Sequence, residues 1–132
     1  MATNGKGTYE ITDRVISLVA KAGVSSGTAT VFVRHTSASL VIMENADPSA
    51  RTDLEEYFER LVPEDADYFI HTYEGSDDMP SHIRMALTGT SEVIPVMEGR
   101  MTLELGRGFF SLSIVEHLIA ARLWWQWWGN KG

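Results

Sequence analysis

The sequence predicts a single α+β domain, in which an antiparallel or mixed β-sheet carries two or three packed helices. The chain has 132 residues, of which 44% are hydrophobic, and this suits one domain with a real core. Apolar residues recur at helical spacing in three segments, and runs rich in Val, Thr, Phe and Ile lie between and after them. No linker, repeat or low-complexity tract divides residues 1–132, so we expect one domain.

The first elements are a short strand, a helix and a long extended run. Residues 8–11 are extended, and Thr12 is a good N-cap residue for a helix that ends at Gly23. An extended run then covers residues 28–43. This run is long for one strand, so we expect a bend or bulge at residues 35–39.

Two further helices are predicted, separated by a long loop. Asp47 is an N-cap carboxylate followed by proline, which is a strong helix start. Leu54, Tyr57, Phe58 and Leu61 then form one apolar stripe of this helix, which ends at Pro63. Residues 63–79 indicate a polar loop, and a loop of this length in a compact domain is usually functional. Pro80 starts a short helix with Ile83 and Leu87 on its inner face. Antiparallel strands are expected after it, at residues 92–96, 101–105, 109–117 and 123–128, with a turn at Glu98-Gly99 between the first two. Residues 117–128 would also fit a short helix.

Composition excludes several classes of protein. The formal net charge of −7 argues against a general nucleic-acid binder, which needs a dense cationic face. The absence of cysteine rules out a disulfide scaffold, a thiolate zinc site and a cysteine nucleophile. No run of apolar residues is long enough for a membrane span. Residues 1–8 do not resemble a secretory signal, so we expect a cytoplasmic protein.

The segment from His35 to Ser39 is the first candidate for a binding site. It places one imidazole and the hydroxyls of Thr36, Ser37 and Ser39 inside an otherwise apolar run. Such groups are suitable donors to phosphate oxygens, and polar groups left unpaired near a core are costly. The alternative is a polar strand end whose hydroxyls bond to local backbone.

His71 and His82 form the second candidate, because the loop between them allows the two imidazoles to converge on one point. His82 is expected in the first turn of its helix, where free backbone N–H groups, including that of Ser81, favour an anion. Alternatively, two imidazoles and a carboxylate could hold Zn²⁺ or a similar metal. Asp77 and Asp78 would also serve Mg²⁺, or cap the helix.

Three weaker candidates complete the set. Glu44 and Asn45 lie where a strand leads into a helix, and could present an acceptor and an amide to a ligand or cation. Glu116 is followed by a histidine at a strand end, where at most one of the two side chains faces a given pocket. The tryptophan-rich residues 124–128 are typical of a core or a subunit contact, so we predict self-association.

The chain contains five sequence motifs that belong together: HTSASL at residues 35–40, ENADP at 44–48, LVP at 61–63, EGSDDMPSHI at 74–83 and LTG at 87–89. These motifs resemble the secondary thiamine-phosphate synthase family, the YjbQ-like proteins. The resemblance extends over residues 7–129 and implies a compact α+β fold assembled as a homotrimer. It also implies a weak or secondary transferase activity, which joins hydroxymethylpyrimidine diphosphate to thiazole phosphate and releases diphosphate.

The resemblance also implies a set of site residues. They are His35, Thr36, Ser37, Ser39, Asn45, His71, His82 and Glu116. In this interpretation His35, His82 and Glu116 are catalytic, and the hydroxyls, Asn45 and Ser81 bind phosphate. A divalent metal, Zn²⁺ or Mg²⁺, would bind His71 and His82, with His35, Glu44 or Asp78 as further ligands, and would neutralise the leaving group.

The chain departs from the family pattern at three places. Leu118 stands where members often carry an arginine after Glu-His, and Arg122 could take over that contact. The last predicted strand is rich in Trp rather than Val. Residues of a first strand are missing, so we expect that Met1 is not the natural start.

Two other functions stay open beside the transferase. One is a metal-dependent hydrolase that uses the same histidines. The other is a non-catalytic protein that binds a phosphorylated metabolite. All three share a polar site for a phosphorylated small molecule.

Overall fold

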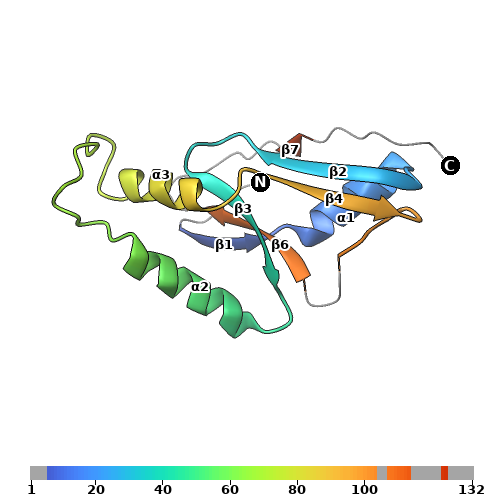
Figure 1. Cartoon of the computed structure of the whole chain (residues 1–132), viewed down its shortest axis with the longest axis horizontal. Coiled ribbons are helices and arrows are strands. Elements are labelled where there is room, and N and C mark those ends of the chain that lie inside the picture. Colours follow the sequence, from blue (N-terminus) through green and yellow to red (C-terminus); the bar gives the residue numbers. More distant parts are fainter. Residues whose placement is uncertain (1–5, 104–106, 114–122, 125–132) are drawn as a thin grey trace.

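The computed structural model describes residues 6–103, 107–113 and 123–124. It confirms the predicted α+β fold. Its elements in chain order are β1 (Gly7–Glu10), α1 (Thr12–Ala22), β2 (Ser26–Val33), β3 (Ala38–Glu44), α2 (Pro48–Leu61), α3 (Asp78–Leu87), β4 (Ser91–Met97), β5 (Arg100–Met101), β6 (Arg107–Ser113) and β7 (Leu123–Trp124). The strands form two antiparallel sheets, ordered β1-β6-β3 and β5-β4-β2-β7 (Figure 1). The two-residue strand β7 pairs with Phe32 and Val33 of β2.

The predicted bend near residues 35–39 separates two strands that belong to different sheets. Expecting one bent strand over residues 28–43 was therefore wrong. β2 buries Ala29, Val31 and Val33, and the polar turn at residues 34–37 redirects the chain into β3. β3 then pairs with β6 instead of continuing beside β4.

The apolar core joins helix α1 to both sheets. It is a cluster of buried side chains: Ile11, Val15, Val19, Ala29, Val31, Val33, Ala38, Leu40, Ile94 and Val96. α1 ends at Gly23 as predicted, because Gly23 adopts a left-handed conformation with φ of 64°. The N-cap residue is Ile11, one position before the predicted Thr12. Thr12 is instead buried in the first turn.

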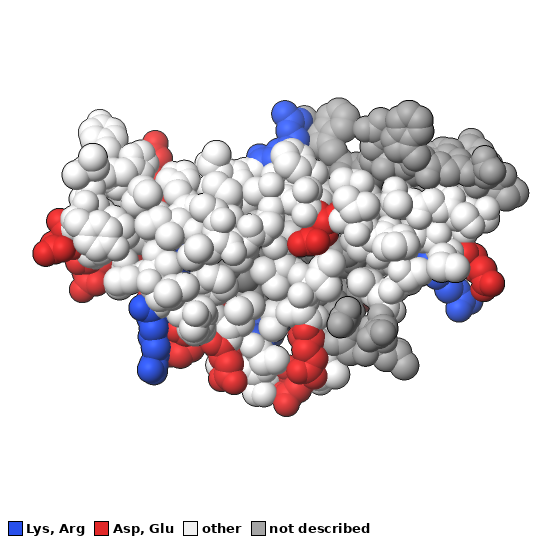
Figure 2. Space-filling view, viewed as in Figure 1, with Lys and Arg blue, Asp and Glu red and all other residues white. Residues whose placement is uncertain are grey.

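Helices α2 and α3 form an arm at one end of the molecule, joined by the long loop that the sequence predicts (Figure 1). α2 starts after Asp47, whose carboxylate accepts a hydrogen bond from Ser49 N at 2.9 Å, and this bond lowers the pKa of Asp47. No residue of α2 is buried, and Tyr57 and Leu61 of its predicted apolar stripe are 59% and 50% exposed. Figure 2 shows charged side chains along the edge that α2 forms.

Polar contacts attach α2 to the rest of the fold. Glu55 accepts hydrogen bonds from the backbone N–H and the hydroxyl of Thr8 in β1. Glu59 Oε1 lies 2.6 Å from Lys6 Nζ and 3.2 Å from Arg84 Nη1. Burial would lower the pKa of Lys6, but its hydrogen bonds to Glu59 and Glu64 outweigh burial and raise it. Ion pairs and hydrogen bonds therefore fix this helix, none of whose residues is fully buried.

Helix α3 turns a different face inward from the one predicted. Its buried residues are Pro80, Ser81 and Arg84, whereas Leu87, predicted inside, is 58% exposed. Arg84 is 2% exposed, and its Nη2 donates to the Val62 carbonyl at 2.7 Å. The C-terminal end of α3 is held against β3, because Thr88 Oγ1 lies 2.6 Å from Ser39 Oγ.

The turn between β4 and β5 lies at Glu98-Gly99, as predicted. Both residues have positive φ, 51° and 75°. This conformation is typical of a two-residue hairpin turn that prefers Asn-Gly. Glu98 thus occupies a backbone region that a glutamate side chain disfavours.

Replacing Glu98 with asparagine is expected to stabilise the protein. Asn tolerates the left-handed region better than Glu, so Glu98→Asn should raise the free energy of unfolding by about 0.5–1 kcal/mol. Urea unfolding followed by circular dichroism measures this change. Glu98→Gln is the matched control, since it removes the same charge without the conformational preference. Equal stabilisation by both variants would contradict the explanation.

Part of the predicted C-terminal structure falls outside the described residues. This applies to Glu116, Leu118, Arg122 and most of the tryptophan-rich segment. Among the helices that the structure describes, none combines the length and the apolar character that crossing a membrane requires.

Candidate metal centre

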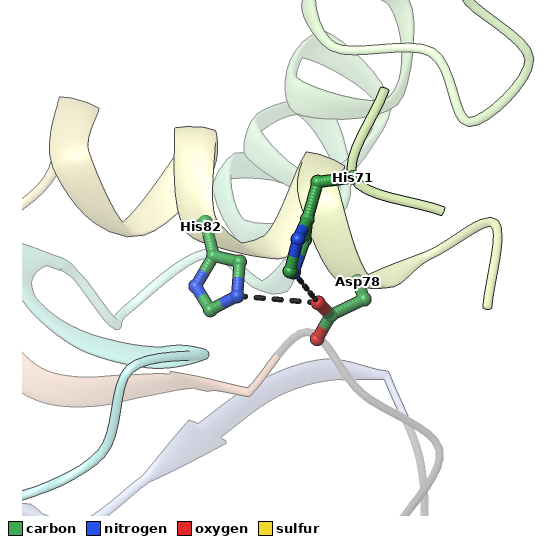
Figure 3. Close-up of side chains that lie close together, drawn as sticks. All are labelled: His71, Asp78 and His82. Carbon is green, nitrogen blue, oxygen red and sulfur yellow. Dashed lines mark hydrogen bonds and ion pairs between the residues drawn. The ribbon is translucent and has the colours of Figure 1, made fainter. Parts of the chain in front are cut away.

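Three side chains with metal-ligating atoms meet beside the start of α3. They are His71 from the α2–α3 loop, Asp78 at the first position of α3, and His82 one turn later (Figure 3). Asp78 Oδ2 lies 2.8 Å from His71 Nε2 and 3.2 Å from His82 Nε2. The two imidazole ring centres are 5.6 Å apart. The prediction that these histidines converge together with a carboxylate is confirmed.

The three donor atoms are spaced closely enough to bind one ion. All lie within 4.8 Å of one another, and bonds of about 2.0–2.2 Å to zinc can bridge that spacing with small side-chain shifts. The Asp78 side chain is 13% exposed, whereas those of His71 and His82 are 49% and 29% exposed. The centre is thus open to solvent on its histidine side.

The start of α3 differs from the prediction. The helix begins at Asp78 instead of Pro80, so His82 lies in the second turn. The backbone N–H of Ser81, expected to be free for an anion, donates to the Asp77 carbonyl at 3.1 Å. The first turn carries the Asp78 carboxylate instead. The residue spacing Asp78–His82 places both side chains on one helix face, as an i, i+4 pair requires.

The orientation of the His82 ring determines which of its nitrogens faces the Asp78 carboxylate. His82 Nδ1 lies 2.9 Å from the Thr36 carbonyl, and a carbonyl can only accept, so Nδ1 carries the proton. In neutral His82 the lone pair of Nε2 then faces the Asp78 carboxylate. Two electron-rich atoms at 3.2 Å repel each other unless a proton or a metal ion lies between them. The His71–Asp78–His82 group is therefore stabilised by a proton or a cation between His82 Nε2 and the Asp78 carboxylate.

A backbone acceptor behind a histidine is a common feature of metal centres. Histidine ligands usually donate their second ring N–H to a carbonyl or carboxylate, which fixes the ring and its tautomer. Thr36 O provides this contact to His82. Sequence reasoning did not find it, because any residue type has a carbonyl and the pairing depends on how the 34–37 turn lies against α3.

The hydroxyl-rich segment at residues 35–39 has both exposed and buried side chains. His35 and Thr36 are exposed, while Ser37 and Ser39 are 3% and 0% exposed. Ser81 is also fully buried, and its hydroxyl donates to the Asp77 carbonyl at 2.5 Å. Local contacts thus satisfy Ser39 and Ser81, so their predicted phosphate-binding role rests on the family resemblance. His35 lies outside the three-residue metal group that the described residues form.

Asn45 makes a contact elsewhere in the fold, and Glu44 is not part of this group. Asn45 Nδ2 donates to Glu10 Oε1 at 2.8 Å, a contact that joins the end of β3 to the end of β1. Glu44 is exposed at the end of β3, and it does not belong to the metal group found among the described residues. Glu116 lies outside the described residues. The roles predicted for these residues stay predictions.

Fold and site together define a small α+β protein with a His-Asp-His group that could hold a metal ion. A sequence model described as "UPF0047 protein YjbQ-like" matches residues 1–117. The chain belongs to this family.

Relatives and solved structures agree with that assignment. The chain is 52% identical over 110 residues to the UPF0047 protein sll1880 of Synechocystis, covering 83% of this chain and 75% of that protein. It is 42% identical over 102 residues to the UPF0047 protein YjbQ of Escherichia coli O157:H7, covering 76% and 73%. A crystal structure of a family protein from Clostridium acetobutylicum aligns with a TM-score of 0.83 and 28% identity, over 95% of this chain and 93% of that chain.

Proposed function

We propose that this protein binds a divalent metal ion at His71, Asp78 and His82, and through it a phosphorylated small molecule. One observation carries the proposal: the hydrogen bond from His82 Nδ1 to Thr36 O leaves Nε2 of His82 facing the Asp78 carboxylate, at 3.2 Å. In neutral His82 this nitrogen carries a lone pair, and a cation shared by the three side chains would remove its repulsion with the carboxylate.

The donor set favours zinc over magnesium. Two imidazole nitrogens and one carboxylate oxygen match the ligands of catalytic zinc sites, whereas Mg²⁺ prefers oxygen donors. Three protein ligands leave coordination positions open, and the exposed His71 side of the group allows a ligand to reach them. A phosphate oxygen is a suitable occupant, because a bound cation would supply positive charge locally in a chain whose formal net charge is −7.

The reaction we propose is the transfer that the family resemblance implies. The thiazole nitrogen of thiazole phosphate forms a bond to the methylene carbon of hydroxymethylpyrimidine diphosphate, the carbon–oxygen bond breaks, and diphosphate leaves with the electron pair. A cation at the His71–Asp78–His82 group would neutralise the charge of the leaving diphosphate. We propose that His35 and Thr36, both exposed near the His82 contact, contribute further donors.

A hydrolase is the second candidate. The observation that favours it is the same open coordination, since three protein ligands leave room for water beside a substrate. A protein that only binds its phosphorylated ligand is the third. The three candidates share the metal centre and differ in product.

Thiamine phosphate formation is expected to depend on both the metal and His82. Protein purified without a His tag should make thiamine phosphate, lose that activity with a chelator, and regain it with Zn²⁺. His82→Ala should lower the rate at least about 100-fold, because it removes one metal ligand. Chromatography of thiamine phosphate, phosphate and diphosphate measures all products at once.

Asp53→Asn, which alters an exposed carboxylate of α2, is the control. Phosphate release without thiamine phosphate would indicate the hydrolase. Metal and ligand binding without any product would indicate the binding protein. Equal rates in wild type and His82→Ala would contradict the assignment of this centre.

We also propose that the chain self-associates as a homotrimer in the cytoplasm. Exposed apolar side chains in the α2–α3 loop support an interface, since Tyr68 is 74%, Ile70 97% and Tyr73 100% exposed. Large side chains of this kind on one loop are typical of surfaces that another chain covers.

A further inference from the structure

The peptide group between Thr36 and Ser37 lies between two imidazoles. Its carbonyl oxygen accepts from His82 Nδ1 at 2.9 Å, and its N–H donates to His35 Nδ1 at 3.1 Å. The Ser37 hydroxyl lies 2.8 Å from the same His35 nitrogen. In a trans peptide the carbonyl and the N–H point in opposite directions, so the two rings hold this peptide from opposite ends.

These contacts determine which nitrogen of each ring carries the proton. A peptide N–H can only donate, so His35 Nδ1 is an acceptor and neutral His35 carries its proton on Nε2. His82 has the opposite tautomer, with its proton on Nδ1. Hydrogen bonds in a chain polarise one another, so donation to His35 makes the Thr36 carbonyl a stronger acceptor for His82.

We infer that His35 is a positioning residue: through the Thr36–Ser37 peptide it orients His82 and directs the Nε2 lone pair of His82 toward Asp78. The turn that carries the contact is anchored at its end, where Ser37 is 3% exposed and Ala38 is 1% exposed. The expected effect of His35 on metal affinity rests on the proposed function. Its expected effect on the His82 tautomer is independent of whether a metal binds.

The same contact could instead be that of a serine nucleophile activated by a histidine. An attacking oxygen must reach its substrate, but Ser37 is almost completely buried. Its hydroxyl also shares the His35 acceptor with its own backbone N–H. The geometry therefore favours positioning over nucleophilic catalysis.

Two substitutions of His35 separate positioning from any chemistry of the exposed ring. His35→Phe keeps a flat ring but removes the acceptor. His35→Asn supplies a side-chain oxygen, which can accept from the N–H two residues later as in an Asx turn, but has no imidazole. The measurements are ¹⁵N NMR of the imidazoles in metal-free protein, which reports the tautomer, and calorimetric titration with Zn²⁺. Ser17→Ala, on the exposed side of α1, gives the baseline for a substitution away from the site.

His35→Phe should change His82 from a single Nδ1–H tautomer to a mixture and weaken Zn²⁺ binding about tenfold, the effect of losing an outer-shell contact. His35→Asn should keep both properties near those of the wild type. If the phenylalanine variant does not fold, His35→Ala makes the same test. An unchanged His82 tautomer without the acceptor, or failure of asparagine to rescue it, would overturn the inference. A wild type that binds no Zn²⁺ defeats the proposed function alone, because the tautomer comparison still decides the role of His35.

Discussion

Replacing Asp78 with asparagine is expected to abolish stoichiometric binding of Zn²⁺. The Asp78 carboxylate faces both imidazoles, at 2.8 and 3.2 Å, and it is the single negatively charged member of the three-residue group. Loss of an outer-shell partner lowers metal affinity about 10–100-fold, so loss of a ligand itself should exceed about 100-fold. Calorimetric titration and elemental analysis of untagged protein measure the effect.

The neighbouring aspartate provides a matched control. Asp77 is the N-cap residue of α3, but its side chain makes no capping hydrogen bond and does not belong to the metal group. Asp77→Asn removes the same charge one residue away and should retain Zn²⁺ affinity within a few-fold. Similar losses in both variants would mean that general negative charge attracts the metal, which would contradict a defined centre.

Replacing Arg84 with alanine is expected to lower the free energy of unfolding more than any other substitution proposed for this protein. Arg84 is 2% exposed, donates to the Val62 carbonyl at 2.7 Å, and pairs with Glu59 at 3.2 Å. Truncation leaves a buried carbonyl unpaired and opens a cavity between α2 and α3. Breaking a buried ion pair costs about 3–5 kcal/mol, and because Glu59 is 40% exposed we expect about 3 kcal/mol.

Urea unfolding measures this loss, and hydrogen exchange should show faster opening of α2 than of the sheets. Arg84→Met fills much of the volume and should lose less than Arg84→Ala. It also removes Arg84 Nε, a buried donor that has no hydrogen-bond partner within the described part of the chain. Arg60→Ala is the control, because the Arg60–Glu56 pair is 79% and 60% exposed and should contribute less than about 0.5 kcal/mol. A similar small loss for Arg84→Ala would contradict its role as the anchor of the arm.

Much of the fold could be predicted because local signals agree with it. Gly23 ends α1 and Asp47 begins α2 through backbone conformation and capping, which depend on adjacent residues. The assignment of β2 and β3 to different sheets could not be predicted in this way. It depends on which distant strand each pairs with, and the alternation of apolar residues does not encode that choice.

The inward faces of α2 and α3 were the least predictable part. Apolar spacing placed Leu61 and Leu87 inside, yet both are half exposed or more. The helices are held instead by Glu59 and Arg84, whose charges indicate an exposed position when the sequence is read alone. A buried arginine is recognisable only once its partners are known.

The sequence predicted the histidines of the candidate site, but it predicted neither the choice of aspartate nor the backbone carbonyl that orients His82. The convergence of His71 and His82 with a carboxylate followed from residue chemistry and from a connection that can turn at Gly75 and Pro80. The choice of Asp78 over Asp77 depends on the helix starting two residues earlier than Pro80 suggests. The Thr36 carbonyl has no sequence signal at all.

The loop between α2 and α3 has a consequence for how proteins of this kind can diversify. Its side chains at positions 68, 70 and 73 are at least 74% exposed, while its two ends are fixed by Arg84 at Val62 and by the start of α3 at Asp78. Substitutions in such a segment have little effect on the folding of a single chain, because these side chains pack little within it, and they act instead on the molecules that the loop contacts. Mutations can therefore accumulate beside His71 without loss of the fold, and selection on them would act on which molecules approach the ligand group. The arm gives this scaffold a place where specificity can evolve separately from stability.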